Sequence, residues 1–101
     1  MKSLEKAEDF NIESGLVAVK FTATWCGPCK KQQPTIDKVE QEFKNVQFIS
    51  IDIDEVPDFN SKFNVKSIPL LILFKDGVEM KRVVGMTLLE SLRTAFREFV
   101  K

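Results

Sequence analysis

The sequence predicts a single α/β domain over residues 1–101, with a mixed central β-sheet flanked by helices on both faces. Three observations support this fold class. Apolar, β-rich runs alternate with segments of helical periodicity, which favours strand–helix–strand crossovers and parallel strands. The last two runs are separated only by Lys75-Asp76-Gly77, a hairpin turn that adds an antiparallel strand. A chain of 101 residues can bury one core but not two.

The first half of the chain alternates between strands and helices. The run Leu16–Thr22 is apolar enough for a strand covered on both faces. A longer helix should follow, with Pro34 kinking it. In chain order, the expected elements are a short edge strand near Lys2–Leu4, a short helix Ala7–Glu13 ended by Gly15, the strand Leu16–Thr22, a helix from Cys29 to about Phe43, and a strand Val46–Ile53.

The second half should hold a short helix, a β-hairpin and a final helix. Leu70–Phe74 is an unbroken apolar run, and the turn after it leads into Val78–Val84. Thr87 and Glu90 have the spacing of a capping box and should open the last helix. The short helix is expected at Pro57–Phe63, and the apolar face of the last helix comprises Leu88, Leu92, Ala95, Phe96 and Phe99.

The charge balance gives no signal for two broad classes of partner, nucleic acids and membranes. Fifteen basic and fifteen acidic residues give a formal net charge of zero, so nothing favours nucleic acid or an anionic membrane surface. The segment Met1–Gly15 is charged and lacks the apolar core of a secretory signal, and no apolar run has membrane-spanning length. We therefore expect no nucleic-acid partner and no membrane association.

The chain has two cysteines, Cys26 and Cys29, and no histidine. Cross-linking residues this close removes little entropy from the unfolded chain, so the pair suits catalysis in a reducing, cytoplasmic compartment better than a structural role. A Cys-x-x-Cys pair is often half of a zinc site. Because this chain has no further cysteine and no histidine, a zinc site or an iron–sulfur cluster would need a dimer. We expect no metal and no cofactor.

The segment Trp25-Cys26-Gly27-Pro28-Cys29-Lys30 carries the chemistry. Its spacing lets the two thiols close a small disulfide ring, and Cys26 falls at a strand-to-helix junction. There, unpaired backbone N–H groups and the helix dipole favour a thiolate. Pro28 in the first helical turn loses no hydrogen bond, and Gly27 should leave the sulfur of Cys26 uncrowded.

Nearly the whole chain resembles the thioredoxin family. The Trp-Cys-Gly-Pro-Cys-Lys motif matches it, and a Cys-x-x-Cys pair beside a βαβ pattern is typical of such redox proteins. Pro34 also matches the proline in the family's long helix. Ser67-Ile68-Pro69 is similar to its Ile-Pro step, in which the proline is cis and faces the disulfide. Val84-Gly85-Met86 falls where the family has a second wall of the substrate groove.

The resemblance implies a thioredoxin fold and a thiol–disulfide oxidoreductase that reduces protein disulfides. Cys26 would be the exposed nucleophile and Cys29 the buried resolving thiol. The implied substrate groove comprises Trp25, Ile68, Pro69, Gly85 and Met86, with Ile68 and Pro69 presenting backbone to an extended substrate. A thioredoxin reductase would be the electron donor, and the protein would act as a monomer in electron transport and cell redox homeostasis.

Two departures from the family pattern affect the site. The family usually has a buried aspartate six residues before the nucleophilic cysteine, where this chain has Lys20, and Ser50 takes the place of its lysine partner. Strand parity places Lys20 on an interior face, so we expect it to be partly buried and to modulate the thiols. Leu70 follows Pro69 where the family usually has threonine, which affects substrate preference.

Two other functions remain open at the level of the sequence. The chain could be a binding or adaptor module whose cysteine pair is not turned over by a reductase. It could also be a specialised, more oxidising disulfide oxidoreductase, which Lys20 favours. The Gly-Pro dipeptide between the cysteines resembles the reducing members and weighs against an oxidising role.

Overall fold

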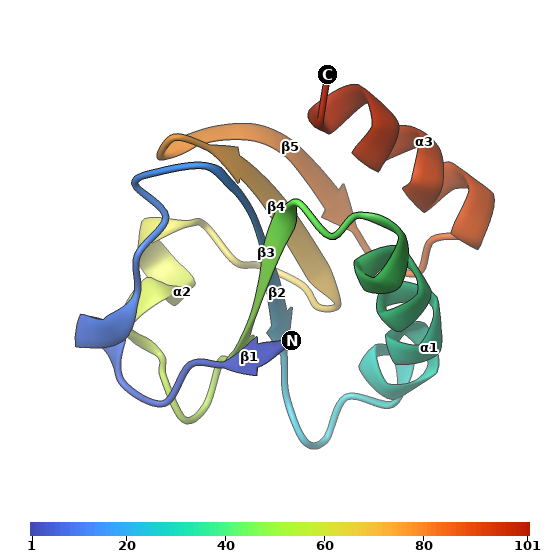
Figure 1. Cartoon of the computed structure of the whole chain (residues 1–101). Helices are drawn as coiled ribbons and strands as arrows, with labels where there is room; N and C mark the ends of the chain where they lie inside the picture. Colours follow the sequence, from blue (N-terminus) through green and yellow to red (C-terminus); the bar gives the residue numbers. More distant parts are fainter.

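The computed structural model describes residues 1–101 and contains a five-stranded mixed sheet (Figure 1). Its order is β1-β3-β2-β4-β5; β1, β3 and β2 run parallel, whereas β4 is antiparallel to both β2 and β5. The strand bounds are Lys2–Ser3 (β1), Leu16–Thr22 (β2), Val46–Asp52 (β3), Leu70–Lys75 (β4) and Val78–Val84 (β5). The predicted fold class is confirmed.

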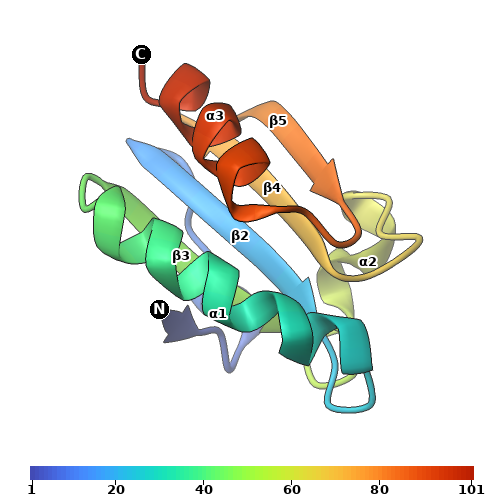
Figure 2. The same cartoon turned by 90° about the vertical axis from the view of Figure 1, so that its right-hand side faces the viewer.

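The helices are divided between the two faces of the sheet. Helices α1 (Gly27–Glu42) and α3 (Leu89–Phe99) lie together on one face, and α2 (Asp58–Lys62) lies on the other (Figure 2). A short 3-10 turn, Ala7–Asp9, has Ala7 packed on the α2 side. None of these helices has the length and apolar character required to cross a bilayer.

Alternating side chains of the central strands enter two apolar layers of one domain, one on each face of the sheet. On β2, Val17, Val19 and Phe21 pack on the α2 side, while Ala18 packs under α1 and α3. Because side chains alternate along a strand, one apolar run supplies both layers. Lys20 follows the parity of Ala18, as predicted, and therefore lies on the α1 side of the sheet.

The hairpin turn between β4 and β5 has the predicted residues in the geometry they favour. Asp76 and Gly77 both have positive φ angles, 49° and 85°, as a type I′ turn requires. The Asp76 carboxylate also accepts a hydrogen bond from Gly15 N at 2.7 Å, and Asp76 N donates to Gly15 O at 2.9 Å. This turn is thereby attached to the segment that leads into β2.

Two predicted helix boundaries are wrong. The segment Ala7–Glu13 forms only the 3-10 turn, because Phe10 is extended and the Asn11 side chain accepts the Glu13 N–H at 2.9 Å. The capping box of α3 does not form: Leu88 is the N-cap residue, without a side-chain cap. Thr87 instead donates its N–H to the Gln32 side chain at 3.0 Å, so a contact with α1 replaces the local cap.

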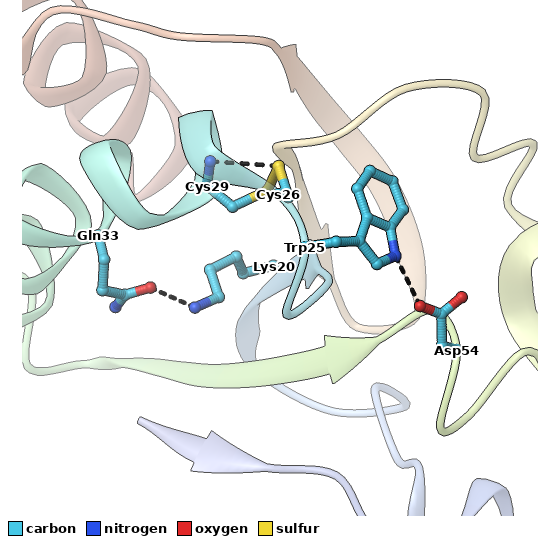
Figure 3. Close-up of a disulfide and its surroundings, with 6 residues drawn as sticks. All are labelled: Lys20, Trp25, Cys26, Cys29, Gln33 and Asp54. Atoms are coloured by element: carbon cyan, nitrogen blue, oxygen red, sulfur yellow. Dashed lines mark hydrogen bonds between the residues drawn. A yellow bond between two sulfur atoms is a disulfide. The ribbon is translucent and has the colours of Figure 1, made fainter.

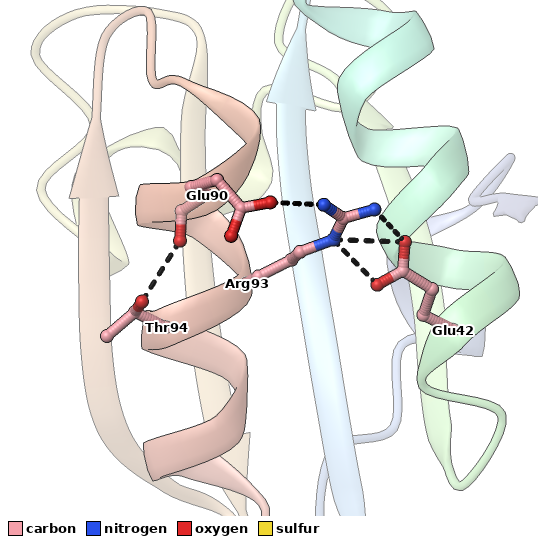
Figure 4. A network of polar contacts seen from close by, with 4 residues as sticks. All are labelled: Glu42, Glu90, Arg93 and Thr94. Atoms are coloured by element: carbon pink, nitrogen blue, oxygen red, sulfur yellow. Dashed lines mark hydrogen bonds and ion pairs between the residues drawn. The ribbon is translucent and has the colours of Figure 1, made fainter.

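Helices α1 and α3 are joined at the surface by Arg93 (Figure 4). Its Nη2 lies 2.7 Å from Glu42 Oε2, its Nε donates to Glu42 Oε1 at 2.8 Å, and its Nη1 pairs with Glu90. These hydrogen bonds hold the pKa of Glu42 below its ordinary value of 4.5 and raise that of Arg93. The Arg93 guanidinium therefore connects α1, which carries the cysteine motif, to α3.

Candidate active site

The cysteine pair lies where β2 gives way to α1. After β2 ends, Cys26 N donates to Ala23 O at 3.1 Å, and Cys26 becomes the N-cap residue of α1. Its Sγ accepts a hydrogen bond from Cys29 N at 3.2 Å (Figure 3). The two sulfurs form a disulfide whose Cα atoms are 5.3 Å apart. One backbone donor at the helix start is thus aimed at the sulfur of Cys26, as the sequence argument required.

The structure corrects one expectation about exposure. Cys26 was expected to be exposed and Cys29 buried, but the two residues are 4% and 5% exposed. They pack with Ala23 in a small apolar cluster against Ile53 and Ile68. In the disulfide form, accessibility therefore does not distinguish the two cysteines. The hydrogen bond from Cys29 N to Cys26 Sγ does distinguish them, because the sulfur of Cys26 accepts it.

Gly27 and Pro28 occupy the first two positions of α1 and are exposed. Pro28 lies where no intrahelical donor is needed, as predicted. A Cβ added at Gly27 would meet no atom within 4 Å outside its two chain neighbours and the nearby backbone of its own helix. Because Cys26 is one of those neighbours, the expectation that Gly27 leaves the Cys26 sulfur uncrowded stays a prediction.

Trp25 extends over the loop that follows β3. It is 66% exposed, and its Nε1 donates to Asp54 Oδ2 at 2.7 Å (Figure 3). Beside it, an apolar cleft of about 290 Å³ is lined by Trp25, Ile53, Val65 and Ile68, together with Lys66 and Ser67. Trp25 and Ile68, predicted together from motifs far apart in sequence, therefore share one concave surface next to the disulfide.

The Ile68–Pro69 peptide bond is cis, which confirms that expectation. Pro69 is buried, and its carbonyl accepts a hydrogen bond from Gly85 N at 2.8 Å. Gly85 has a φ of +81°, a conformation that strains residues with a Cβ. The next residue, Met86, is 54% exposed. The two predicted walls of the groove are therefore joined backbone to backbone, with one apolar side chain directed to solvent.

Lys20 lies below the disulfide on the α1 side of the sheet. It is half-buried and hydrogen-bonded by its Nζ to the side-chain oxygen of Gln33 (Figure 3). Lys20, Cys29 and Gln33 line one open cleft of about 260 Å³. Burial lowers the pKa of Lys20 from its ordinary value of 10.5, while the carboxylates of Asp37 and Glu40 oppose that shift. The predicted partial burial is confirmed, and Ser50 is its neighbour on β3.

Sequence reasoning missed three polar residues of this region. Asp54 holds Trp25, Gln33 holds Lys20, and Gln32 binds the backbone of Thr87. Of these three residues, only Gln32 could have been recognised from the sequence pattern. It shares the buried face of α1 with Cys29, Ile36 and Val39 at helical spacing, where an apolar residue would be expected.

Comparisons with known proteins agree with this arrangement. A sequence profile of the family "Thioredoxin" matches residues 3–98. The chain is 45% identical to a thioredoxin of Chlamydia caviae over 94 residues, 91% of this chain and 92% of that protein. It is 49% identical to thioredoxin-2 of Saccharomyces cerevisiae over 86 residues, covering 81% and 83%.

Solved structures are similar over nearly the full chain. The X-ray structure of Fasciola hepatica thioredoxin superimposes with a TM-score of 0.87 at 31% identity, covering 98% of this chain and 99% of that one. The crystal structure of thioredoxin from Trypanosoma brucei brucei gives a TM-score of 0.88 at 33% identity, covering 97% and 88%.

Proposed function

The chain belongs to the thioredoxin family, and from this premise we propose which role each residue of the site has in the reduction of protein disulfides. The protein is a thiol–disulfide oxidoreductase. The observation that carries this function is the Cys26–Cys29 disulfide at the start of α1. The binding or adaptor module and the specialised, more oxidising oxidoreductase are not favoured, because the chain matches the thioredoxin family and has its cysteine pair at disulfide distance.

In the proposed reaction, Cys26 is the attacking thiol. Its thiolate attacks one sulfur of a substrate disulfide, forming a mixed disulfide and releasing the other substrate sulfur as a thiolate that takes up a proton. Cys29 then loses its proton and attacks Cys26 Sγ, which closes the intramolecular disulfide and releases the second substrate thiol. The two electrons pass from the dithiol to the substrate. The backbone donor from Cys29 to Cys26 Sγ supports this order, because it would stabilise a thiolate on Cys26.

We assign substrate binding to Trp25, Ile68, Pro69, Gly85 and Met86. An extended substrate segment would pair with the backbone beside Ile68 as an added strand, and Pro69 offers no N–H that competes for it. The apolar cleft beside Trp25 would take a side chain of the substrate next to its cysteine. Met86 supplies exposed apolar surface beyond Gly85.

Lys20, Gly27 and Pro28 are proposed to modulate the thiols rather than react. Pro28 fixes the first turn of α1, and thereby the donor at Cys29 N. Gly27, which has no side chain and open space where a Cβ would lie, leaves room for substrate backbone beside Cys26. Lys20 places a cation in the cleft that Cys29 also lines.

A thioredoxin reductase is the proposed electron donor, and the cytoplasm the proposed location. A dithiol that must be regenerated needs a reducing compartment, and cell redox homeostasis and electron transport follow from such a cycle. The protein would work as a monomer, because both cysteines and every proposed groove residue belong to one chain.

Reduction of insulin tests this function, first with dithiothreitol and then with a thioredoxin reductase and NADPH as electron donor. Turbidity from the precipitating insulin chains is expected with both, and Cys26→Ser should abolish it. Activity with dithiothreitol alone would contradict the proposed donor. Activity with neither would leave the adaptor as the better interpretation.

A further inference from the structure

Gln32 is the one buried polar side chain of the protein, only 4% exposed, and it lies one helical turn after Cys29. Its Nε2 donates to Thr87 O at 2.9 Å, and its Oε1 accepts from Thr87 N at 3.0 Å. The amide therefore satisfies both backbone groups of one residue, as a neighbouring strand would. Because a buried polar group is costly unless it is paired, this two-point contact is a defined structural link.

The segment held by this link is the loop from Gly85 to Leu88, between β5 and α3. Its two apolar side chains do not anchor it, since Met86 and Leu88 are 54% and 81% exposed. What fixes the loop is hydrogen bonding: Gly85 N donates to Pro69 O at 2.8 Å, and Thr87 is bound by Gln32. Gln32 is thus the side chain that ties one proposed groove wall to the helix that begins at the cysteine motif.

Water has little room to replace the amide. Gln32, Thr87, Gly85 and Pro69 line a site between α1, β4 and α3 whose cavity volume is about 10 Å³. That is at or below the volume that one water molecule needs. If the amide were lost, the N–H and C=O groups of Thr87 would have to move toward solvent to be satisfied, and the loop would move with them.

We propose that Gln32 is a positioning residue that keeps the Gly85–Met86 wall preformed for extended protein disulfides. The proposal rests on the substrate groove assigned above and deepens it. A preformed wall spares the substrate the cost of ordering the loop, which affects binding of a polypeptide but not attack on a small disulfide. Gln32 does not touch the sulfurs, so the thiol chemistry itself should be unchanged.

The first test replaces Gln32 by methionine, which keeps the length of the side chain and removes both hydrogen bonds. The matched control is Gln41→Met, an exposed position on the same helix. With insulin as substrate and dithiothreitol as donor, KM should rise by at least about fivefold, the effect of one net hydrogen bond on an equilibrium constant, because two such bonds are removed. The kcat, and the rate with a small aromatic disulfide, should match those of the parent. Amide exchange at Thr87 should accelerate, while exchange at Val19 stays slow.

The second test uses Gln32→Glu, a substitution that makes the hydrogen bonds between residue 32 and Thr87 depend on pH. Its carboxylate accepts from Thr87 N but repels Thr87 O and is attracted by Lys20, the one charged residue that lines the same site, whereas the protonated acid restores both bonds. The KM ratio to the parent, measured at each pH, should therefore fall toward one as pH decreases. An unchanged insulin KM in Gln32→Met, or a pH-independent ratio in Gln32→Glu, overturns the proposal. Failure of the parent itself to reduce insulin would instead refute the proposed function.

Discussion

Replacing Lys20 by methionine should make the protein more reducing. The Lys20 ammonium shares the cleft below the disulfide with Cys29. Burial lowers the pKa of Lys20, but the nearby Asp37 and Glu40 carboxylates oppose that shift, and we expect the charged form at neutral pH. A cation there stabilises thiolate in the reduced protein and leaves the neutral disulfide nearly unaffected. Removing it weakens the reduced state alone, so the reduction potential falls.

Coulomb's law gives the scale of the effect. Two unit charges about 8 Å apart interact by about 2 kcal/mol at an effective dielectric constant of about 20. Because the cleft opens to water and Lys20 is half-buried, screening reduces this to about 1 kcal/mol. That corresponds to about 20 mV in the two-electron couple and to somewhat under one pKa unit in a thiol.

Two measurements check this expectation. Equilibration with glutathione gives the reduction potential, and the pH profile of iodoacetamide alkylation gives the thiol titration. Lys20→Arg should keep the parent values, and Lys38→Met, an exposed lysine of α1, is the control for total charge. The difference should fade as pH rises through the pKa of Lys20, which burial places below 10.5. Equal potentials and profiles for Lys20→Met and the parent would refute the reasoning; a higher potential would indicate a neutral Lys20 acting as a base.

Three further outcomes test other parts of the site and scaffold. Cys29→Ser should trap substrates as stable mixed disulfides and Cys26→Ser should trap none, as non-reducing electrophoresis will show; the reverse pattern would exchange their roles. Gly85→Ala, at a φ of +81°, should lower the unfolding free energy by about 1 kcal/mol in denaturant titration and weaken insulin binding. Arg93→Met should lower the melting temperature at neutral pH. Because the pKa of Glu42 is lowered in the folded state, that difference should persist above pH 4.5 and vanish as pH falls through the folded-state pKa.

The sequence predicts the elements that depend on local pattern. Leu16–Thr22 and Val78–Val84 begin and end as expected, because apolar or β-rich runs there are bounded by turn residues. The capping box at Thr87 fails for a reason no local pattern contains: its backbone is bound by Gln32, 55 residues away. The tertiary contact with Gln32 therefore prevents the cap that the Thr87/Glu90 spacing predicts.

The candidate site likewise has features that the sequence predicts and features that it does not. The cysteine pair and the cis Ile68–Pro69 bond were expected from motifs that resemble the family. The partners of Trp25 and Lys20 were not, because Asp54 and Gln33 are 29 and 13 residues away and are ordinary polar residues in sequence. Only folding shows which of many exposed carboxylates and amides lies within reach of the site.

The position of Trp25 gives this protein its own optical reporter. The chain has one tryptophan and no tyrosine, so its intrinsic emission arises from an indole that adjoins Cys26 in sequence. That residue is 66% exposed, its indole is held by Asp54, and it lines the apolar cleft to which we assign substrate binding. Oxidation, reduction and substrate docking can therefore be followed in the unlabelled protein. The signal comes from the site alone, without background from the core, where phenylalanine is the only aromatic residue.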